Sequence, residues 1–535
     1  MLKVVYKDLA VGVTGNVTNV ASESQDFVDM GQLDEEDLHI LNYGTLEGNH
    51  WQLKDNVLIL PDDLSNIDLG YWSESMSDEN GDFDTPITIT RTYNGTFTSS
   101  GITIDFDTNN EVFASEVNIK WYRGATLLSN KDYTPTSSTF FFQNNVVAYD
   151  KIVFTFTKTN VPSRFLRVFH IYDGTIRQFF KDEIVGLEIL ENISDVGDEI
   201  QINTMNLDLI SKSPVKMLFQ KVQALSVYNN DTLYGTFFVD SSERTLNHYK
   251  INCYDYVGML DNNTHNGGLY NNVTANALIT ELMQDIPFEL DNSLKNVLIK
   301  GYLPIDTCRN NLMQVAFVLG AVVDTSRTDK VLIYPLPQIS TAYDLDESKV
   351  AFETTENSEA PYTAVTVSEH SYIRQAEATS LYEEVLNGEA FVDFGYPVSN
   401  LSISGGTIVE SGTNYARIRG TGSTVTLTGY AYDDIAVQKT KTNPLNTTNS
   451  IPNVFEITDA TLVNSSNSAT ILDRIGTALF NNATIDFSFL LDDERVGDFV
   501  NIPTDEGTKT GQILSIDYQL NGNKIMCNAT LREVI

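Results

Sequence analysis

Cysteine, basic side chains and long apolar runs are all scarce in this sequence of 535 residues. Only three cysteines occur: Cys253, Cys308 and Cys527. Such a sparse, odd count excludes a disulfide framework and favours synthesis in a reducing compartment. No run approaches the ~18 apolar residues that a membrane-spanning helix needs. The N-terminus alternates like a strand and lacks the apolar core of a signal peptide. We therefore expect neither membrane insertion nor export through a secretory signal.

The charge balance is strongly acidic, because 34 Lys and Arg face 72 Asp and Glu and leave a formal net charge of −38. Specific nucleic-acid binding is excluded, because it requires clustered Lys and Arg to neutralise phosphate. Hydrophobic residues make up 41% of the chain, which is enough to build sizeable cores. The 25 tyrosines and 27 phenylalanines favour strands over helices. An acidic run at 34–37 predicts a solvated loop.

Shifts in composition along the chain predict a multidomain, mainly β protein with a small α+β module. Residues 71–173 are rich in Thr, Ser and Asn around short apolar runs, which predicts an inserted, self-contained β-sandwich. The flanking segments 1–70 and 174–265 then form one split β domain, an antiparallel meander or β-barrel. A helix–hairpin α+β module follows at 266–340, and further β domains with one helix occupy 341–535.

Three helices interrupt the strand pattern. The first is predicted after Thr274, a good N-cap, and before Pro287, which stops it. The second is predicted between Thr307 as N-cap and Gly320 at the position of a C-terminal glycine, with apolar residues at helical spacing. The third covers about 468–480.

Metal-binding signals in the sequence are weak. Calcium prefers clustered oxygen ligands, and Asp78, Asn80, Asp82 and Asp84 place oxygens at alternate positions. Gly81, however, does not occupy the place that an EF-type loop requires for its glycine. We therefore keep these four residues as weak calcium candidates beside the interpretation of a solvated turn. The histidines lie far apart, without zinc-ligand spacing: His39, His50, His170, His248, His265 and His370.

Catalytic signatures are equally sparse. The sequence contains no G-x-S-x-G elbow and no P-loop. Cys308 at the start of a predicted helix is more simply a buried structural thiol than a nucleophile. No pair among the carboxylates stands out as a glycosidase pair. We expect a protein that is not an enzyme and holds no cofactor.

Aromatic residues of segment 71–173 are the remaining binding candidates. Trp72, Trp121 and Tyr122 are able to stack on a sugar ring, and we treat them as possible glycan contacts. In a β-sandwich, however, such residues more often belong to the core. Both interpretations stay open at this point.

The order of several local patterns resembles the hub proteins at the tip of phage tails and of related contractile injection machines. Residues 200–204 (IQINT) and 254–260 (YDYVGML) look like the first β domain of that family. Residues 301–334, from GYLPIDTCRNNL to KVLIY, look like its helix-then-hairpin module. Residues 495–503 (RVGDFVNIP) and 510–517 (TGQILSID) look like its closing strands. The resemblance covers the chain outside segment 71–173.

The resemblance implies a structural virion protein of the tail tip or baseplate, made in the host cytoplasm. Such a hub forms a homotrimeric ring that closes the distal end of the tail tube and provides a conduit for DNA during genome ejection. Its implied partners are the tail tube, the distal tail protein, the C-terminus of the tape measure, the tip or spike protein and other baseplate proteins. An acidic lumen would repel phosphate, which suits a conduit. The same charge equally suits a solvated extracellular protein, so the charge does not decide between the two.

Segment 71–173 departs from the hub pattern and looks like a discoidin-type or carbohydrate-binding jelly roll. An alternative function is therefore a glycan-binding adhesin that acts through this inserted β-sandwich. The chain also ends after the hub pattern, without the peptidase or lysozyme extension that some relatives carry. We expect any cell-wall hydrolysis to come from another polypeptide.

Overall fold

The computed structural model describes residues 2–35 except 14, residues 47, 53–54 and 57–58, and most of 69–534. Within the last range, the residues left out are 195, 213–215, 338, 340–341, 347, 352–353, 359, 445–450, 481–482, 506 and 521–524. The chain divides into two compact units. The small unit comprises Val5–Phe179 and Ser213–Leu225, and the large unit comprises Met1–Val4, Phe180–Lys212 and Ser226–Ile535.

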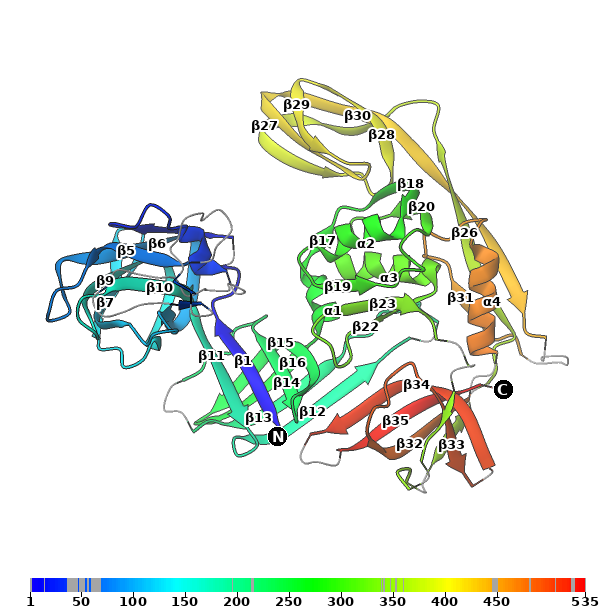
Figure 1. Ribbon diagram of the computed structural model, residues 1–535. Helices are drawn as coiled ribbons and strands as arrows, with labels where there is room; N and C mark the ends of the chain where they lie inside the picture. Colours follow the sequence, from blue (N-terminus) through cyan, green and yellow to red (C-terminus); the bar gives the residue numbers. More distant parts are fainter. Residues whose placement is uncertain are drawn as a thin grey trace. The chain divides into compact units, whose positions relative to one another are not determined.

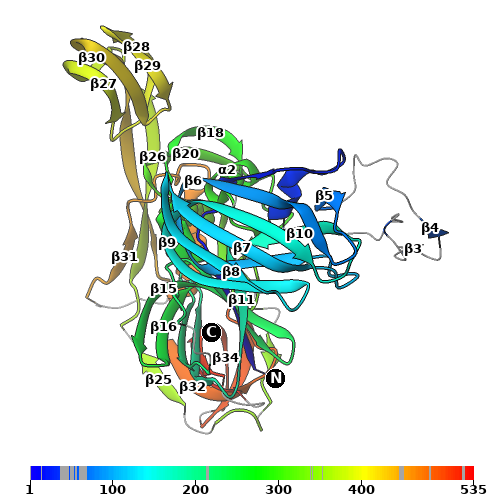
Figure 2. The same ribbon diagram turned by 90° about the vertical axis from the view of Figure 1, so that its left-hand side faces the viewer.

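One strongly bent sheet forms most of the small unit, and Figure 2 shows its central strands side by side. Its strand order is β5-β10-β6-β9-β7-β8. Strand β2 pairs with β6 as well. The strands are β5 (Tyr71–Met76), β6 (Asp82–Phe106), β7 (Ala114–Arg123), β8 (Thr126–Tyr133), β9 (Thr139–Thr159), β10 (Phe165–Tyr172) and β2 (Val17–Ala21). The unit also contains β3 (Leu53–Lys54), β4 (Val57–Leu58), the 3-10 helix η1 (Met30–Asp34) and β11 (Gly174–Phe180), which pairs with β1 (Lys3–Leu9).

Bulges allow the long strands β6 and β9 to bend, so that both ends of each strand pack on the same hydrophobic core. The pairing of β6 with β9 changes register between Thr92 and Phe97, and again before Ser99 and Gly101. Each β-bulge bends the strand and increases its twist. Residues on both sides of these bulges, such as Ile89 and Ile104, share one hydrophobic core.

The large unit is organised by a sheet that joins strands from distant parts of the sequence (Figure 1). Its order within this unit is β14-β15-β16-β13-β12-β34-β35-β32-β25, with β33 on β34 and β24 on β33. The earlier strands are β12 (Ile184–Asn192), β13 (Thr204–Ile210), β14 (Ala224–Asn229), β15 (Thr232–Thr245) and β16 (His248–Tyr254). The later strands are β24 (Tyr343–Asp344), β25 (Thr355–Ser358), β32 (Ala483–Leu491), β33 (Phe499–Thr504), β34 (Gly507–Gln519) and β35 (Ile525–Glu533). The link between the two sets is the antiparallel pairing of β12 with β34, from Glu188 opposite Gln519 to Asn192 opposite Ser515.

A small α+β module follows β16. It contains α1 (Tyr256–Met259), η2 (Leu260–Asn262), β17 (Thr264–His265), β18 (Gly268–Thr274), α2 (Ala275–Met283), β19 (Phe288–Leu290), β20 (Leu298–Leu303), β21 (Asp306–Thr307), α3 (Cys308–Leu319), β22 (Ala321–Asp324) and β23 (Val331–Pro335). Helices α2 and α3 pack on a shared core with β20, β22 and β23. The predicted caps are confirmed: Thr274 accepts from the backbone of Ala277, Thr307 accepts from Asn310, and Gly320 ends α3 with φ 63°.

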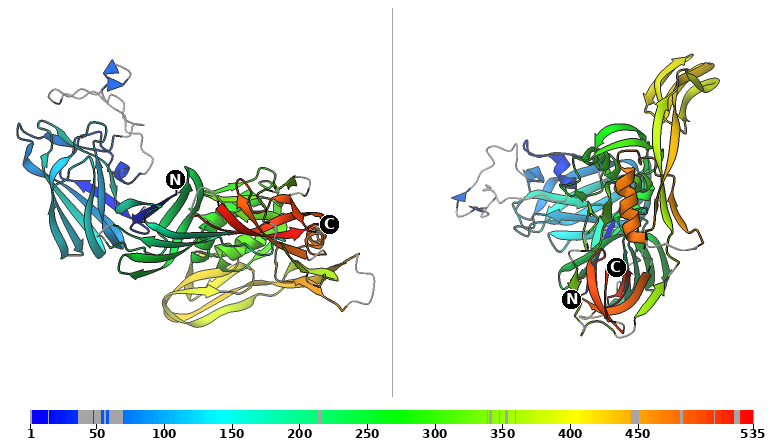
Figure 3. Two further views of the ribbon diagram at one scale, coloured as in Figure 1. Left: turned by 90° about the horizontal axis from the view of Figure 1, so that it is seen from below. Right: turned by 90° about the vertical axis from the view of Figure 1, so that its right-hand side faces the viewer.

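A six-stranded sheet, which we call the ribbon, and a helix complete the large unit. The strands are β26 (Ala364–Arg374), β27 (Thr379–Asp393), β28 (Val398–Ser404), β29 (Gly406–Ser411), β30 (Tyr415–Thr442) and β31 (Val454–Ile457). Helix α4 (Ser468–Leu479) matches the third predicted helix and packs against β26 (Figure 3). Ile471 and Ile475 contact Val365 and Val367 in that core. The prediction of a mainly β chain with a small α+β module is confirmed.

Among the described helices, none combines the length and the apolar character needed to span a bilayer.

Candidate functional site

A buried polar junction lies where three parts of the large unit meet. Asp255 caps α1 by accepting from the backbone of Gly258 at 3.0 Å, and it also accepts from the backbone of Asn203 at 2.9 Å. The Thr325 hydroxyl donates to the same carboxylate, and the Asn203 amide donates to Thr325 at 3.0 Å. Burial raises the pKa of Asp255 to about 6, while these hydrogen bonds act in the opposite direction.

The second half of the junction is an ion pair between Arg327 and Glu191. Arg327 donates to both carboxylate oxygens of Glu191, at 3.3 and 3.4 Å, and the Tyr518 hydroxyl donates to Glu191 at 2.8 Å. The side chains of Arg327 and Glu191 are only 5% and 1% exposed. Burial raises the pKa of Glu191, and the Arg327 charge opposes that shift. Arg327 lies in the turn between β22 and β23, with φ 54°.

The junction therefore joins segments that are far apart in the sequence. Asn203 precedes β13, Asp255 follows β16, Arg327 lies in the α+β module and Tyr518 belongs to β34. Its polar groups are hydrogen-bonded to one another, so the arrangement holds the segments together. The sequence did not reveal Glu191, Arg327 or Tyr518, because no local spacing distinguishes them.

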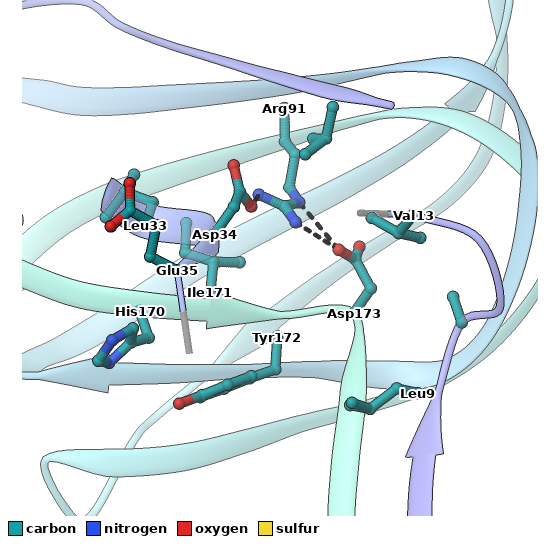
Figure 4. A pocket seen from close by; sticks show the side chains of 12 residues that line it. Leu9, Val13, Leu33, Asp34, Glu35, Arg91, His170, Ile171, Tyr172 and Asp173 are labelled. Carbon is teal, nitrogen blue, oxygen red and sulfur yellow. Dashed lines mark hydrogen bonds and ion pairs between the residues drawn. The ribbon is translucent and has the colours of Figure 1, made fainter. Parts of the chain in front are cut away.

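A second buried network lies in the small unit, around Arg91 (Figure 4). Arg91 donates to Asp173 at 2.5 Å and also pairs with Asp34. The hydroxyl of Tyr93 donates to Asp173 as well. The adjoining cavity measures only about 70 Å³, far below the volume of a typical ligand pocket. We assign this network to the stability of the small unit.

The prediction of a solvated acidic loop at 34–37 is wrong for Asp34. Its carboxylate accepts from Asn19 at 2.6 Å and is paired with Arg91, whose side chain is 2% exposed. The unpaired charge of a buried arginine is costly, and Asp34, the last residue of η1, compensates it. Glu36 and Asp37 of this run, like His39 and His50, lie outside the described residues.

The calcium candidates form an exposed turn in the small unit. Asp78 accepts from the backbone amides of Asn80 and Asp82 at 2.7 and 2.9 Å, as an Asx turn does. Asp82 also pairs with Lys158 at 3.0 Å, and Asp84 is exposed. Across the described ranges, no three His, Cys, Asp or Glu side chains converge as metal ligands. Calcium binding by these residues stays a prediction.

The aromatic candidates are mostly inside the small unit. Trp72 is 6% exposed, stacks on the Arg167 guanidinium at 4.0 Å and donates to the carbonyl of Leu69. Trp121 is fully buried in the hydrophobic core. Neither indole ring is therefore available to a sugar. Tyr122 is half-buried, with the Lys151 ammonium 4.6 Å from its ring centre.

The three cysteines are free and buried, and all of them belong to the large unit. Burial raises the pKa of Cys308, as expected for a structural thiol rather than a nucleophile. Burial also raises the pKa of Cys527 to about 12.

No family model and no curated protein sequence matches the chain. Among solved structures, the chain is similar to the 43 kDa tail protein of prophage MuSo2 from Shewanella oneidensis, with 10% identity and a TM-score of 0.41 over 67% of this chain and 95% of that chain. The tail protein from Neisseria meningitidis MC58 gives 9% identity and a TM-score of 0.41 over 67% and 94%. The c3393 protein of E. coli, a component of the type VI secretion system, gives 7% identity and a TM-score of 0.33 over 66% and 74%.

Proposed function

We propose that this chain is a structural hub protein of the tail tip or baseplate of a phage tail or a related injection machine. The observation that carries the proposal is the buried junction of the large unit. Three of the five stretches that resemble hub proteins, 200–204, 254–260 and 301–334, meet there through Asn203, Asp255 and Thr325. Tyr518, which directly follows the stretch 510–517, completes the junction. If the chain shares the architecture of hub proteins, the segments that resemble that family should follow the same order in the sequence and should also pack on one another.

In the proposed assembly, three copies form a ring that closes the distal end of the tail tube and leaves a conduit for DNA. A symmetric ring is a common closed arrangement for identical subunits. The net charge of −38 per chain supports a conduit role, because an acidic surface repels DNA phosphate. The proposed partners are the tail tube, the distal tail protein, the tape measure C-terminus and the tip or spike protein, with the virion tail tip as the location.

Segment 71–173 is proposed as an inserted β-sandwich that contacts neighbouring tail proteins. The alternative of a glycan-binding adhesin acting through this segment finds less support. Two of its three candidate aromatic residues, Trp72 and Trp121, are buried.

The mass of the purified full chain in solution tests the proposed assembly. We expect a homotrimer of about 179 kDa, three times the chain mass of 59.6 kDa, in mass photometry. A stable dimer or tetramer would contradict the proposal.

A further inference from the structure

A large cleft opens in the large unit, away from the junction. It measures about 850 Å³, within the range of pockets that hold small molecules and short oligomers. Tyr270, Tyr372 and Tyr432 line it, and we call it the tyrosine cleft. These three side chains come from β18, β26 and β30, so the ribbon and the α+β module each supply a wall.

Hydrogen bonds fix the walls of the tyrosine cleft relative to one another. The Tyr372 hydroxyl donates to the carbonyl of Thr461 at 3.3 Å, and the backbone of His370 donates to Val463 at 2.8 Å. The Asn464 amide donates to the carbonyl of Lys300 at 3.0 Å, which ties the third wall to β20. A cleft whose walls are already ordered loses little conformational entropy when a ligand binds.

The lining is poor in charge, although the chain as a whole carries −38. Glu369 and Lys300 are the charged side chains among the described lining residues. Glu369 is occupied, because it accepts from Ser468 at 2.5 Å and lies 3.7 Å from the Lys439 ammonium. The cleft is therefore close to neutral, which disfavours a strongly charged ligand.

Neutral hydrogen-bonding groups take the place of charges in this cleft. Asn271 and Asn272 are exposed on its β18 wall, at a bulge where the pairing with β20 changes register. Asn272 adopts a left-handed backbone with φ 61°, and bulges of this kind redirect side chains. Ser465 adds a hydroxyl group on another wall, and the Ser466 hydroxyl, which donates to Asn464 at 2.5 Å, adds an acceptor there.

We propose that the tyrosine cleft binds an uncharged oligosaccharide. A pyranose ring has an apolar face that packs on an aromatic ring, and a rim of hydroxyls that need donors and acceptors. The cleft offers both kinds of group: half-buried tyrosine rings and the amides and hydroxyls around them. This inference does not depend on the tail role, because it stands on the cleft of the large unit alone.

Titration of the full chain with chitohexaose, cellohexaose and maltohexaose, followed by saturation-transfer NMR and calorimetry, tests the proposal. We expect at least one of these sugars to bind with a Kd below about 1 mM. Tyr432→Ala and Tyr270→Ala should each weaken that binding by about tenfold or more. The matched control is Tyr396→Ala, which removes a tyrosine that is 38% exposed and outside the cleft, and it should leave binding unchanged.

Protection of the buried cysteines from a thiol reagent shows in parallel that each variant is folded. The proposal is overturned if none of the three sugars binds at about 10 mM. It is also overturned if a sugar binds equally well to both cleft variants. Footprinting that finds the cleft covered by a second polypeptide in the assembled particle would assign it to a protein partner and would likewise contradict the proposal.

Discussion

At the scale of single residues, buried charges determine which substitutions the fold tolerates. Arg327 in the large unit and Arg91 in the small unit are each enclosed and paired with carboxylates. A buried pair contributes little net stability, because desolvation offsets the attraction between the charges. Removing one partner is different, since it leaves the other charge buried and uncompensated.

We expect Arg327→Met to lower the free energy of unfolding of the large unit by about 3–5 kcal/mol, because Glu191 stays buried without its partner. Arg327→Met combined with Glu191→Gln should recover part of this loss. The measurement is the rate at which the buried thiols react during denaturant titration. The control Arg309→Met removes an exposed pair with Asp261 and should cost about 1 kcal/mol or less. Equal losses in the two variants would contradict the account.

The Asp255 carboxyl should make the stability of the large unit depend on pH. Its pKa is raised from the ordinary 3.8 to about 6, so the folded chain holds a proton that the unfolded chain releases in this window. The resulting stabilisation is complete below pH 3.8 and is lost as the pH rises through about 6. Between about pH 7 and 5 the wild-type chain should gain about 1 kcal/mol relative to Asp255→Asn. Parallel stability profiles of the two proteins would show that Asp255 does not titrate in this way.

At the scale of secondary-structure elements, local signals predicted the helices well. Thr274 and Thr307 cap their helices as expected, and α4 lies within one residue of the predicted range. These predictions succeed because a cap and an apolar stripe are properties of a few neighbouring residues. The pairing of β12 with β34 is not of this kind, because the two strands are separated by most of the large unit. Strand pairing over such distances has no local signature in the sequence.

The cap of α3 gives a test at this scale. We expect Thr307→Ala to cost about 1 kcal/mol, because the backbone N–H of Asn310 loses its acceptor. Thr477→Ala, on the exposed side of α4, removes a bond to the carbonyl of Asp473 and should change stability by less than about 0.5 kcal/mol. Thermal melting of both variants distinguishes the two effects. A neutral Thr307→Ala would indicate that solvent satisfies the end of α3.

The tyrosine cleft was harder to predict from the sequence than the helices. The residues of the tyrosine cleft come from β18, β26, β30 and the loop after β31, which only the tertiary fold brings together. The aromatic residues that did attract attention, Trp72 and Trp121, proved to be buried. Composition identifies aromatic residues, but burial depends on which strand face meets the core.

At the scale of the whole molecule, the chain carries separate probes for its two units. The three cysteines belong to the large unit, whereas Trp72 and Trp121 belong to the small unit and Trp51 falls in the same stretch of sequence. Tryptophan fluorescence therefore reports on the small unit, and thiol reactivity reports on the large one.

A substitution in one unit should change the unfolding transition of that unit alone. We expect Arg91→Met to destabilise the fluorescence-detected transition by about 3–5 kcal/mol, because Asp173 loses its buried partner, and to leave thiol protection unchanged. Arg327→Met should show the opposite pattern. Identical shifts in both signals for either variant would mean that the two units unfold as one.

Activity assays address the proposed absence of catalysis. We expect the purified chain to release no soluble sugar or peptide from bacterial cell walls, because its sequence contains neither a G-x-S-x-G elbow nor zinc-ligand spacing. Release that a single carboxylate-to-amide change abolishes would contradict a purely structural role.

In the proposed function, three copies of this chain form a hub with a passage through its centre. Two-dimensional class averages of the purified full chain, recorded by electron microscopy, test this arrangement. We expect ring-shaped particles with threefold symmetry and a hollow axis. Particles with twofold or fourfold symmetry, or threefold particles whose centre is closed by protein, would contradict it.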